Sequence, residues 1–248
     1  MPPKQSKQGG KKSPQTSMKN WYEVMPSSFK TTYSNPSYES CYISHPFRML
    51  ICAQSGGGKT TVAMDIIYRL QNTFNKIVLC VKHADEPLYN YLRSKIKPEY
   101  IDIFEDGKVP TVKTYADHDG QLLIIFDDLV NEPRKTQDAI KEWFIRGRKG
   151  CKNNQGASMM YLTQSYFAVP KTIRIQTNYI VLKKLNSTKD LTMIMRDFSL
   201  GLEKEELLDI YKFCTDDFTN FLMVDIDVPP EKRFRKGYFH IINVPTDE

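Results

Sequence analysis

Short, uninterrupted apolar runs alternate along the chain with segments in which apolar residues recur at helical spacing. Apolar runs without polar alternation predict strands buried on both faces, as in a parallel sheet. The strand candidates are residues 47–52, 76–81, 121–126, 158–163 and 178–182, and the helix candidates are 58–72, 86–96, 134–148, 187–197 and 203–214. This alternation predicts an α/β fold with a mostly parallel central sheet flanked by helices.

The hydrophobic pattern also divides the chain into regions. Residues 47–248 contain the alternating segments and are expected to form one domain, ending in a pair of strands at 219–225 and 237–243. Residues 21–46 form a lead-in in which aromatic residues are interleaved with prolines. The lead-in is expected to add a short strand to the edge of the sheet. Its aromatic residues are expected either to pack against the core or to contact another subunit or a capsid.

Residues 1–20 differ from the rest of the chain in charge. They contain five lysines and no acidic residue, at positions 4, 7, 11, 12 and 19. Since the whole chain has a net charge of +6, the other residues carry only about +1 (6 − 5). With few apolar residues, this stretch is predicted to be a disordered basic arm. Such an arm favours nucleic acid or an acidic protein surface, or serves only as a solubility tail.

The remaining composition excludes several classes of protein. No apolar run approaches the roughly 18 residues that a membrane span requires. The five cysteines include no C-x-x-C pair, which favours buried, reduced thiols in an intracellular protein. The four histidines are scattered, which argues against a zinc site.

The strongest chemical signal is a glycine-rich loop between the first strand candidate and the first helix candidate. It follows the phosphate-binding pattern G-x-x-x-x-G-K-[ST], with alanine at the first glycine position. The predicted nucleotide-binding residues are Ala53, Gln54, Ser55, Gly56, Gly57, Gly58, Lys59, Thr60 and Thr61. Backbone N–H groups of such a loop bind phosphate, Lys59 would reach the β- and γ-phosphates, and the Thr60 hydroxyl would ligate Mg²⁺. The expected ligands are therefore ATP and Mg²⁺.

Two acidic residues follow the third apolar strand, 121–126. Asp127 is placed to hold Mg²⁺ beside Thr60. Asp128 is placed to orient or deprotonate the attacking water. A strand-terminating acidic turn is the simpler explanation of the pair, but the upstream phosphate loop favours the catalytic interpretation.

Three further polar residues are candidates for the same site. Gln164 follows the next apolar strand, where an amide can contact the γ-phosphate or hold the water. Arg148 and Arg174 are candidates for an arginine finger, which neutralises charge on the transferring phosphoryl group and often comes from a neighbouring subunit. Arg146 and Arg148 also suit a helix C-terminus or a nucleic-acid backbone, so the choice stays open.

Taken in order, the motifs of this chain resemble those of one family. The motifs are the loop at 53–60, Ile124–Asp128, Arg148, Leu162–Gln164 and Pro170–Arg174. It is similar to the DNA-packaging ATPases of large DNA viruses, poxviruses, virophages and polinton-like elements in the FtsK–HerA superfamily. The compact length and basic arm most resemble the virophage members, and the resemblance covers about residues 45–185.

This resemblance implies a RecA-like ATPase core, usually a ring, that pumps double-stranded DNA into a preformed capsid. Lys59 and Thr60 would be its Walker A residues, Asp127 its Mg²⁺ ligand and Asp128 its catalytic acid. Gln164 would be the sensor, and Arg148 or Arg174 the finger acting in trans. The implied partners are double-stranded DNA and a capsid or portal-vertex protein. The implied location is the host cytoplasm or a viral factory, with association with the virion.

Two other functions remain open from the residues. A small-molecule P-loop kinase would need an arginine-bearing lid, which Arg146 and Arg148 could imitate, although Gln164 argues against it. A nucleotide-bound structural subunit of a virion would use the same loop without turnover. A GTPase is excluded because Asn75-Lys76 precedes a strand and lacks the aspartate of a guanine-reading motif.

Overall fold

The computed structural model describes residues 18–198, 200 and 202–243, and divides the chain into two units, Met1–Thr32 and Tyr33–Glu248. The described part of the first unit contains helix α1 (Trp21–Val24) and a 3-10 turn (Ser27–Phe29). The predicted basic arm falls almost entirely on residues 1–17, outside the described part of the chain. Between residues 21 and 46 the only regular secondary structure is short helical turns, so the expectation of an edge strand there is wrong. The prolines of this stretch disfavour a strand, because proline lacks the N–H donor that pairing with a neighbouring strand requires.

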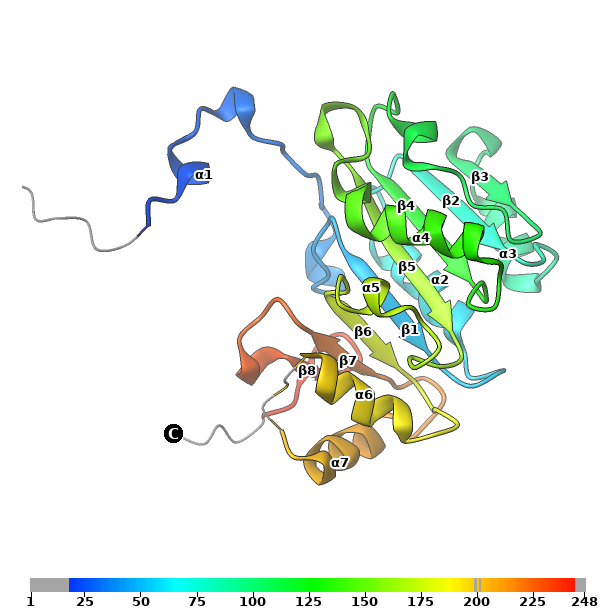
Figure 1. Cartoon of the computed structure of the whole chain (residues 1–248), viewed down its shortest axis with the longest axis vertical. Helices are drawn as coiled ribbons and strands as arrows, with labels where there is room; N and C mark the ends of the chain where they lie inside the picture. Colours follow the sequence, from blue (N-terminus) through cyan, green and yellow to red (C-terminus); the bar gives the residue numbers. More distant parts are fainter. Residues whose placement is uncertain (1–17, 199, 201, 244–248) are drawn as a thin grey trace, which may run out of the picture. The chain divides into compact units, whose positions relative to one another are not determined.

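The second unit is built around a nine-stranded sheet of order β3-β2-β4-β5-β1-β6-β7-β8-β9 (Figure 1). The first six strands in this order are mutually parallel, and β7, β8 and β9 continue the sheet in antiparallel fashion. The strands are β1 (Arg48–Cys52), β2 (Lys76–Val81), β3 (Ile101–Phe104), β4 (Leu122–Asp127), β5 (Ala157–Thr163), β6 (Tyr179–Leu182), β7 (Leu222–Asp225), β8 (Phe234–Lys236) and β9 (His240–Ile241). The predicted α/β class with a mostly parallel sheet is therefore confirmed.

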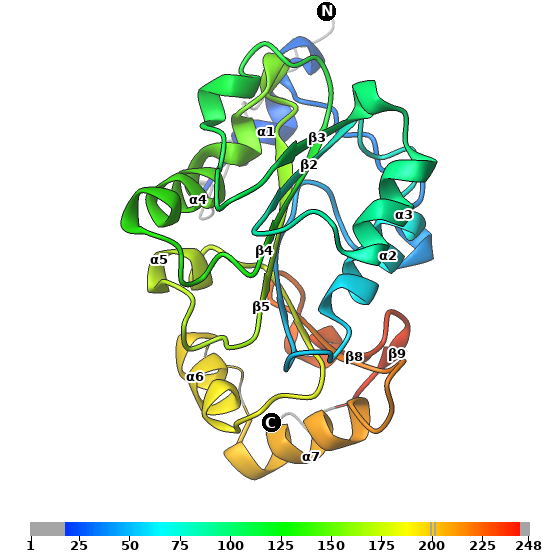
Figure 2. The same ribbon diagram turned by 90° about the vertical axis from the view of Figure 1, so that its right-hand side faces the viewer.

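Helices cover both faces of the sheet (Figure 2). On one face, α2 (Lys59–Arg69) and α3 (Pro87–Lys95) pack over a core that includes Ile51, Leu79 and Ile125. On the other face lie α4 (Arg134–Arg146), α5 (Lys171–Arg174), α6 (Lys189–Phe198) and α7 (Lys204–Cys214), over the second core cluster. Because neighbouring residues of a strand point to opposite faces, each buried strand contributes to both cores.

Short 3-10 helices lie in the connections at Tyr38–Ser40, Pro98–Tyr100, Val112–Tyr115, Gly147–Lys149, Lys152–Asn154 and Pro230–Lys232. Among the described residues, no helix combines the length and apolar character needed to cross a membrane.

The register of the sheet places the ends of four strands together. Cys52, the last residue of β1, lies opposite Thr163 of β5 and Leu182 of β6. Asp127, the last residue of β4, lies opposite Leu162 of β5. The loops that follow β1, β4, β5 and β6 therefore meet at the carboxyl edge of the sheet, where ligands bind in open α/β folds.

Candidate functional site

The glycine-rich loop links β1 to α2 and is held by both neighbouring strands. The Ala53 amide donates to the Thr163 carbonyl at 3.2 Å, and the Gln54 amide donates to the Lys184 carbonyl at 2.9 Å. Gly58 caps α2 in a left-handed conformation with φ of 86°, which favours glycine. At Gly57 an added Cβ would lie 2.8 Å from the Gln54 carbonyl oxygen. The loop thus requires glycine at two positions and presents a helix N-terminus, as a phosphate site does.

Lys59 and Asp128 lie close together where the loop ends and α2 begins. Lys59 is buried in the first turn of α2, and its Nζ lies 3.9 Å from Asp128 Oδ1. Asp128 follows β4 with a left-handed backbone at φ of 52°, and its side chain is half exposed. The carboxylate is therefore next to the lysine and open to solvent, where an attacking water could reach it.

Asp127 occupies a buried position beside them. The Tyr89 hydroxyl donates to its Oδ2 at 2.5 Å, whereas its Oδ1 has no hydrogen-bond partner among the described residues. Burial raises the pKa of Asp127 to about 6. Its neighbour Asp128 adds to the rise, whereas the Tyr89 hydrogen bond and Lys59 oppose it. A buried carboxylate oxygen without a partner is costly unless a cation or donor reaches it.

Magnesium fits this arrangement because it prefers oxygen ligands and takes only one or two of them from the protein at nucleotide sites. Asp127 Oδ1 and the Thr60 hydroxyl are oxygens of that kind. No cluster of three or more histidine, cysteine, aspartate or glutamate residues occurs in the described part of the chain, so a dedicated protein cage for a metal is not formed there.

Gln164 follows β5 directly, and its side chain is exposed. Because β5 lies between β1 and β4, this residue comes between the phosphate loop and the acidic pair at the carboxyl edge. The structure thus brings Lys59, Asp127, Asp128 and Gln164 to one edge, as the strand pattern predicts.

The two finger candidates lie in different surroundings. Arg174 is only 8% exposed, and its Nε contacts Asp197 Oδ2 at 2.8 Å. Its Nη1 donates to the carbonyls of Phe167 and Val169, so the guanidinium is bonded within its own chain. Arg148 is exposed and close enough to Arg48 to contribute to lowering the pKa of that residue, which burial mainly causes.

Arg148 is therefore near the start of β1, whereas the phosphate loop follows its end. At about 3.3 Å per residue the strand separates these ends by roughly 13 Å, so Arg148 lies away from the phosphate loop of the same chain.

A cavity of about 500 Å³ adjoins the loop at Gln54, Gly56 and Gly57. Its other walls include Tyr211 and Phe218, and two lysines that follow β6, Lys183 and Lys184. The buried Lys183 ammonium donates to the Phe218 carbonyl and lies 4.7 Å from the centre of its ring. Burial lowers the pKa of Lys183.

Sequence reasoning did not select Lys183 and Phe218. Lys183 follows an apolar strand in the same way as Asp127 and could have been found by that signal. Phe218 has no such signal, because it reaches the loop from a distant part of the chain.

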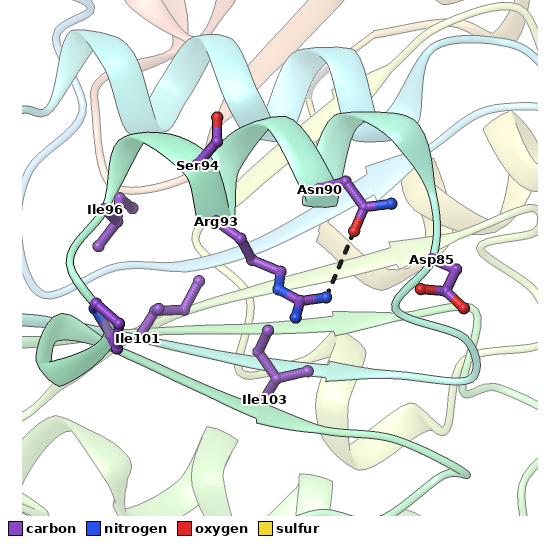
Figure 3. A pocket seen from close by; sticks show the side chains of 8 residues that line it. Asp85, Asn90, Arg93, Ser94, Ile96, Ile101 and Ile103 are labelled. Atoms are coloured by element: carbon purple, nitrogen blue, oxygen red, sulfur yellow. Dashed lines mark hydrogen bonds between the residues drawn. The ribbon is translucent and has the colours of Figure 1, made fainter.

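A larger cavity of about 800 Å³ lies elsewhere, between α3 and the edge strand β3 (Figure 3). Ile101 and Ile103 line it from β3, and Arg93 and Asn90 line it from α3. None of the phosphate-loop residues contributes to it. The smaller cavity beside the loop is therefore the better candidate for a nucleotide.

Solved structures with the same fold include viral and bacterial ATPases. B204, the DNA-packaging ATPase from Sulfolobus Turreted Icosahedral Virus, has 14% sequence identity and a TM-score of 0.56, with coverage of 82% of this chain and 98% of that chain. B204 from Sulfolobus turreted icosahedral virus 2 in complex with AMPPCP has 12% identity and a TM-score of 0.52, covering 79% of this chain and 98% of that chain. EssC (ATPases 2 and 3) from Geobacillus thermodenitrificans has 12% identity and a TM-score of 0.52, covering 82% and 41% respectively. A comparison with curated proteins gave no match.

Fold and site together define a P-loop ATPase: a phosphate loop after β1, a buried acid at the end of β4 and a mostly parallel sheet between helices. The model of the Poxvirus A32 protein family matches residues 37–226, which is more than half of the chain. The chain belongs to this family. The resemblance to viral packaging ATPases of the FtsK–HerA type is thereby confirmed.

Proposed function

We propose that the protein is a DNA-packaging motor that hydrolyses ATP and translocates double-stranded viral DNA into a preformed capsid. The observation that carries this proposal is the meeting of Lys59, Asp127 and Asp128 beside the phosphate loop, in a member of the Poxvirus A32 protein family. The B204 structures with the same fold belong to genome-packaging enzymes, which supports the extension to DNA.

Each residue at the carboxyl edge has a proposed task. The backbone at residues 53–61 holds the phosphates, and Lys59 neutralises charge on the β- and γ-phosphates. Thr60 and Asp127 Oδ1 hold Mg²⁺, which when bound neutralises charge on the phosphate oxygens. Asp128 orients the attacking water and accepts its proton, and Gln164 senses the γ-phosphate.

The cavity beside the loop is the proposed site of the base and ribose. It is lined by Gly56 and Gly57 and by two aromatic residues, Tyr211 and Phe218. Phe218 packs so closely against the loop that a Cβ on Gly58 would lie 3.1 Å from its ring. A base entering the cavity would therefore contact an aromatic side chain.

The motor is proposed to be a homo-oligomeric ring in which Arg148 completes the site of the neighbouring subunit. Arg148 is exposed and lies away from the phosphate loop of its own subunit, whereas Arg174 is committed to Asp197. Double-stranded DNA and a capsid or portal-vertex protein are the proposed partners, and the five lysines of residues 1–20 are a proposed DNA contact. The proposed location is the host cytoplasm or a viral factory, with association with the virion.

The test is the ATPase rate of the purified protein with and without double-stranded DNA. We expect DNA to stimulate turnover, and Lys59→Ala and Asp127→Ala to abolish it. A rate that rises instead with a nucleoside acceptor, with formation of a diphosphate product, would identify a kinase. Bound nucleotide without turnover under any condition would identify a structural subunit.

A further inference from the structure

Tyr89 lies at the proposed magnesium site, although it belongs to neither sequence motif. It comes from the first turns of α3, which follows β2, the strand next to β4. Val81 at the end of β2 lies opposite Asp127 at the end of β4, so α3 begins close to the acidic pair. The Tyr89 side chain is only 1% exposed and packs in the core beneath α2 and α3.

The Tyr89 hydroxyl is hydrogen-bonded to Asp127, one of the two proposed metal ligands. It donates to Asp127 Oδ2 at 2.5 Å. The hydroxyl is the donor in this hydrogen bond, because an ionised carboxylate has no proton to give.

The hydrogen bond gives the two oxygens of the Asp127 carboxylate different roles. Oδ2 is occupied by Tyr89, and Oδ1 is the oxygen that has no partner among the described residues. A carboxylate that binds a metal is commonly oriented by a donor to its other oxygen, and loss of that donor weakens metal binding.

We propose that Tyr89 is a positioning residue for magnesium: it fixes Asp127 through Oδ2 so that Oδ1 remains available to the metal. This inference rests on the proposed function, because it assumes that Asp127 is a ligand of nucleotide-bound Mg²⁺. Tyr89 itself touches neither nucleotide nor metal in this role.

The test compares Tyr89→Phe with Tyr91→Phe, a change on the same helix at an exposed tyrosine. Binding of the non-hydrolysable analogue AMPPCP is measured by calorimetry, first in EDTA and then over a titration of MgCl₂. We expect Y89F to raise the Mg²⁺ concentration for half-maximal tightening by roughly tenfold and to leave binding in EDTA unchanged. Y91F should match the unaltered protein in both measurements.

A second arm tests whether Tyr89 acts through Asp127. Asp127→Asn keeps an oxygen for Tyr89 but removes the charge, so AMPPCP binding to this variant should no longer depend on Mg²⁺. Adding Y89F to that variant should then change nothing further. Thermal unfolding verifies that each variant folds.

Three outcomes would overturn the inference. They are an unchanged Mg²⁺ dependence in Y89F, an equal loss of affinity with and without Mg²⁺, and an additive effect in the double variant. In these cases the proposed function stands. Absence of Mg²⁺-dependent binding in the unaltered protein would overturn the proposed function and this inference together.

Discussion

The two adjacent aspartates differ in their surroundings, and this predicts different losses of function. Asp127 is buried against Tyr89, whereas Asp128 is half exposed and 3.9 Å from Lys59. Asp128→Asn should leave Mg²⁺-dependent nucleotide binding intact and slow hydrolysis by about 10²–10⁴-fold, because only the proton acceptor is lost. Single-turnover hydrolysis and AMPPCP binding measure the two effects separately.

A suitable control is Asp209→Asn, at an exposed aspartate on α7 whose only described ion pair is with Lys212. It should change neither quantity. If Asp128→Asn lost nucleotide binding to the same extent as hydrolysis, the assignment of Asp128 to the water would be wrong.

His45 gives the protein a predicted pH dependence of stability. The ring is buried before β1, with Nδ1 2.8 Å from the Ser158 hydroxyl oxygen, and burial lowers its pKa to about 4. The unfolded chain has a histidine pKa near 6.5, so between about pH 6.5 and 4 it binds a proton that the folded chain does not. The free energy of unfolding therefore falls as the pH is lowered through this range, by up to about 3 kcal/mol.

Urea unfolding at pH 7.5, 6, 5 and 4.5 measures this effect in the unaltered protein and in His45→Gln. Glutamine does not titrate. The free energy of unfolding of the unaltered protein should therefore decrease, relative to that of His45→Gln, as the pH falls. A constant difference across the series would show that His45 titrates normally in the folded state.

At the scale of elements, the buried ion pair between Arg174 and Asp197 connects α5 to α6. Both side chains are about one-tenth exposed, and the Tyr166 hydroxyl also donates to Asp197 at 3.0 Å. Removing one partner of a buried pair leaves an uncompensated charge and typically costs about 3–5 kcal/mol. Arg174→Ala should therefore lower the free energy of unfolding by this order, and Asp197→Asn should change it in the same direction.

Thermal and urea unfolding measure this loss, with Arg148→Ala as the exposed control that should unfold as the unaltered protein does. An Arg174→Ala protein of normal stability that fails to hydrolyse ATP would instead identify Arg174 as a catalytic arginine.

The strands that sequence reasoning places accurately are those whose residues are buried on both faces. Strands β1, β2, β4, β5 and β6 follow the predicted ranges within one residue at each end, because their apolar runs are continuous. Strand β3 was missed because Ile101–Phe104 is short, contains Asp102 and is only half-buried at the edge. The terminal pair of strands is observed as three short strands, with β8 (Phe234–Lys236) lying in the predicted gap.

The residues of the candidate site could likewise be predicted only where the sequence pattern places them in the sheet. Residues that follow predicted strands, such as Asp127 and Gln164, could be placed at the carboxyl edge because parallel strands end there together. Tyr89 could not, since its contact with Asp127 spans 38 positions of sequence and depends on the packing of α3. A tyrosine in an amphipathic helix has the same pattern whether it packs in the core or holds a catalytic acid.

At the scale of the whole molecule, the separation of Arg148 from the phosphate loop predicts a site shared between subunits. Arg148 lies near Arg48 at the start of β1, and the loop follows Cys52 at its end. An arginine finger supplied by a neighbour typically accelerates hydrolysis by 10³–10⁵-fold. Arg148→Ala alone should therefore be almost inactive while binding nucleotide normally, and Lys59→Ala alone should be inactive because its own loop fails.

Mixing these two inactive proteins distinguishes a finger acting in trans from one acting in cis. A Lys59→Ala subunit still has Arg148, which can serve the intact loop of an adjacent Arg148→Ala subunit. In an equal mixture that exchanges freely, about one site in four combines an intact loop with a neighbouring arginine, so roughly a quarter of the unaltered rate should return. A cis arginine restores no activity, because no subunit in the mixture has both residues. The DNA-stimulated ATPase rate, followed as the ratio of the two variants is changed, should be greatest at equal proportions.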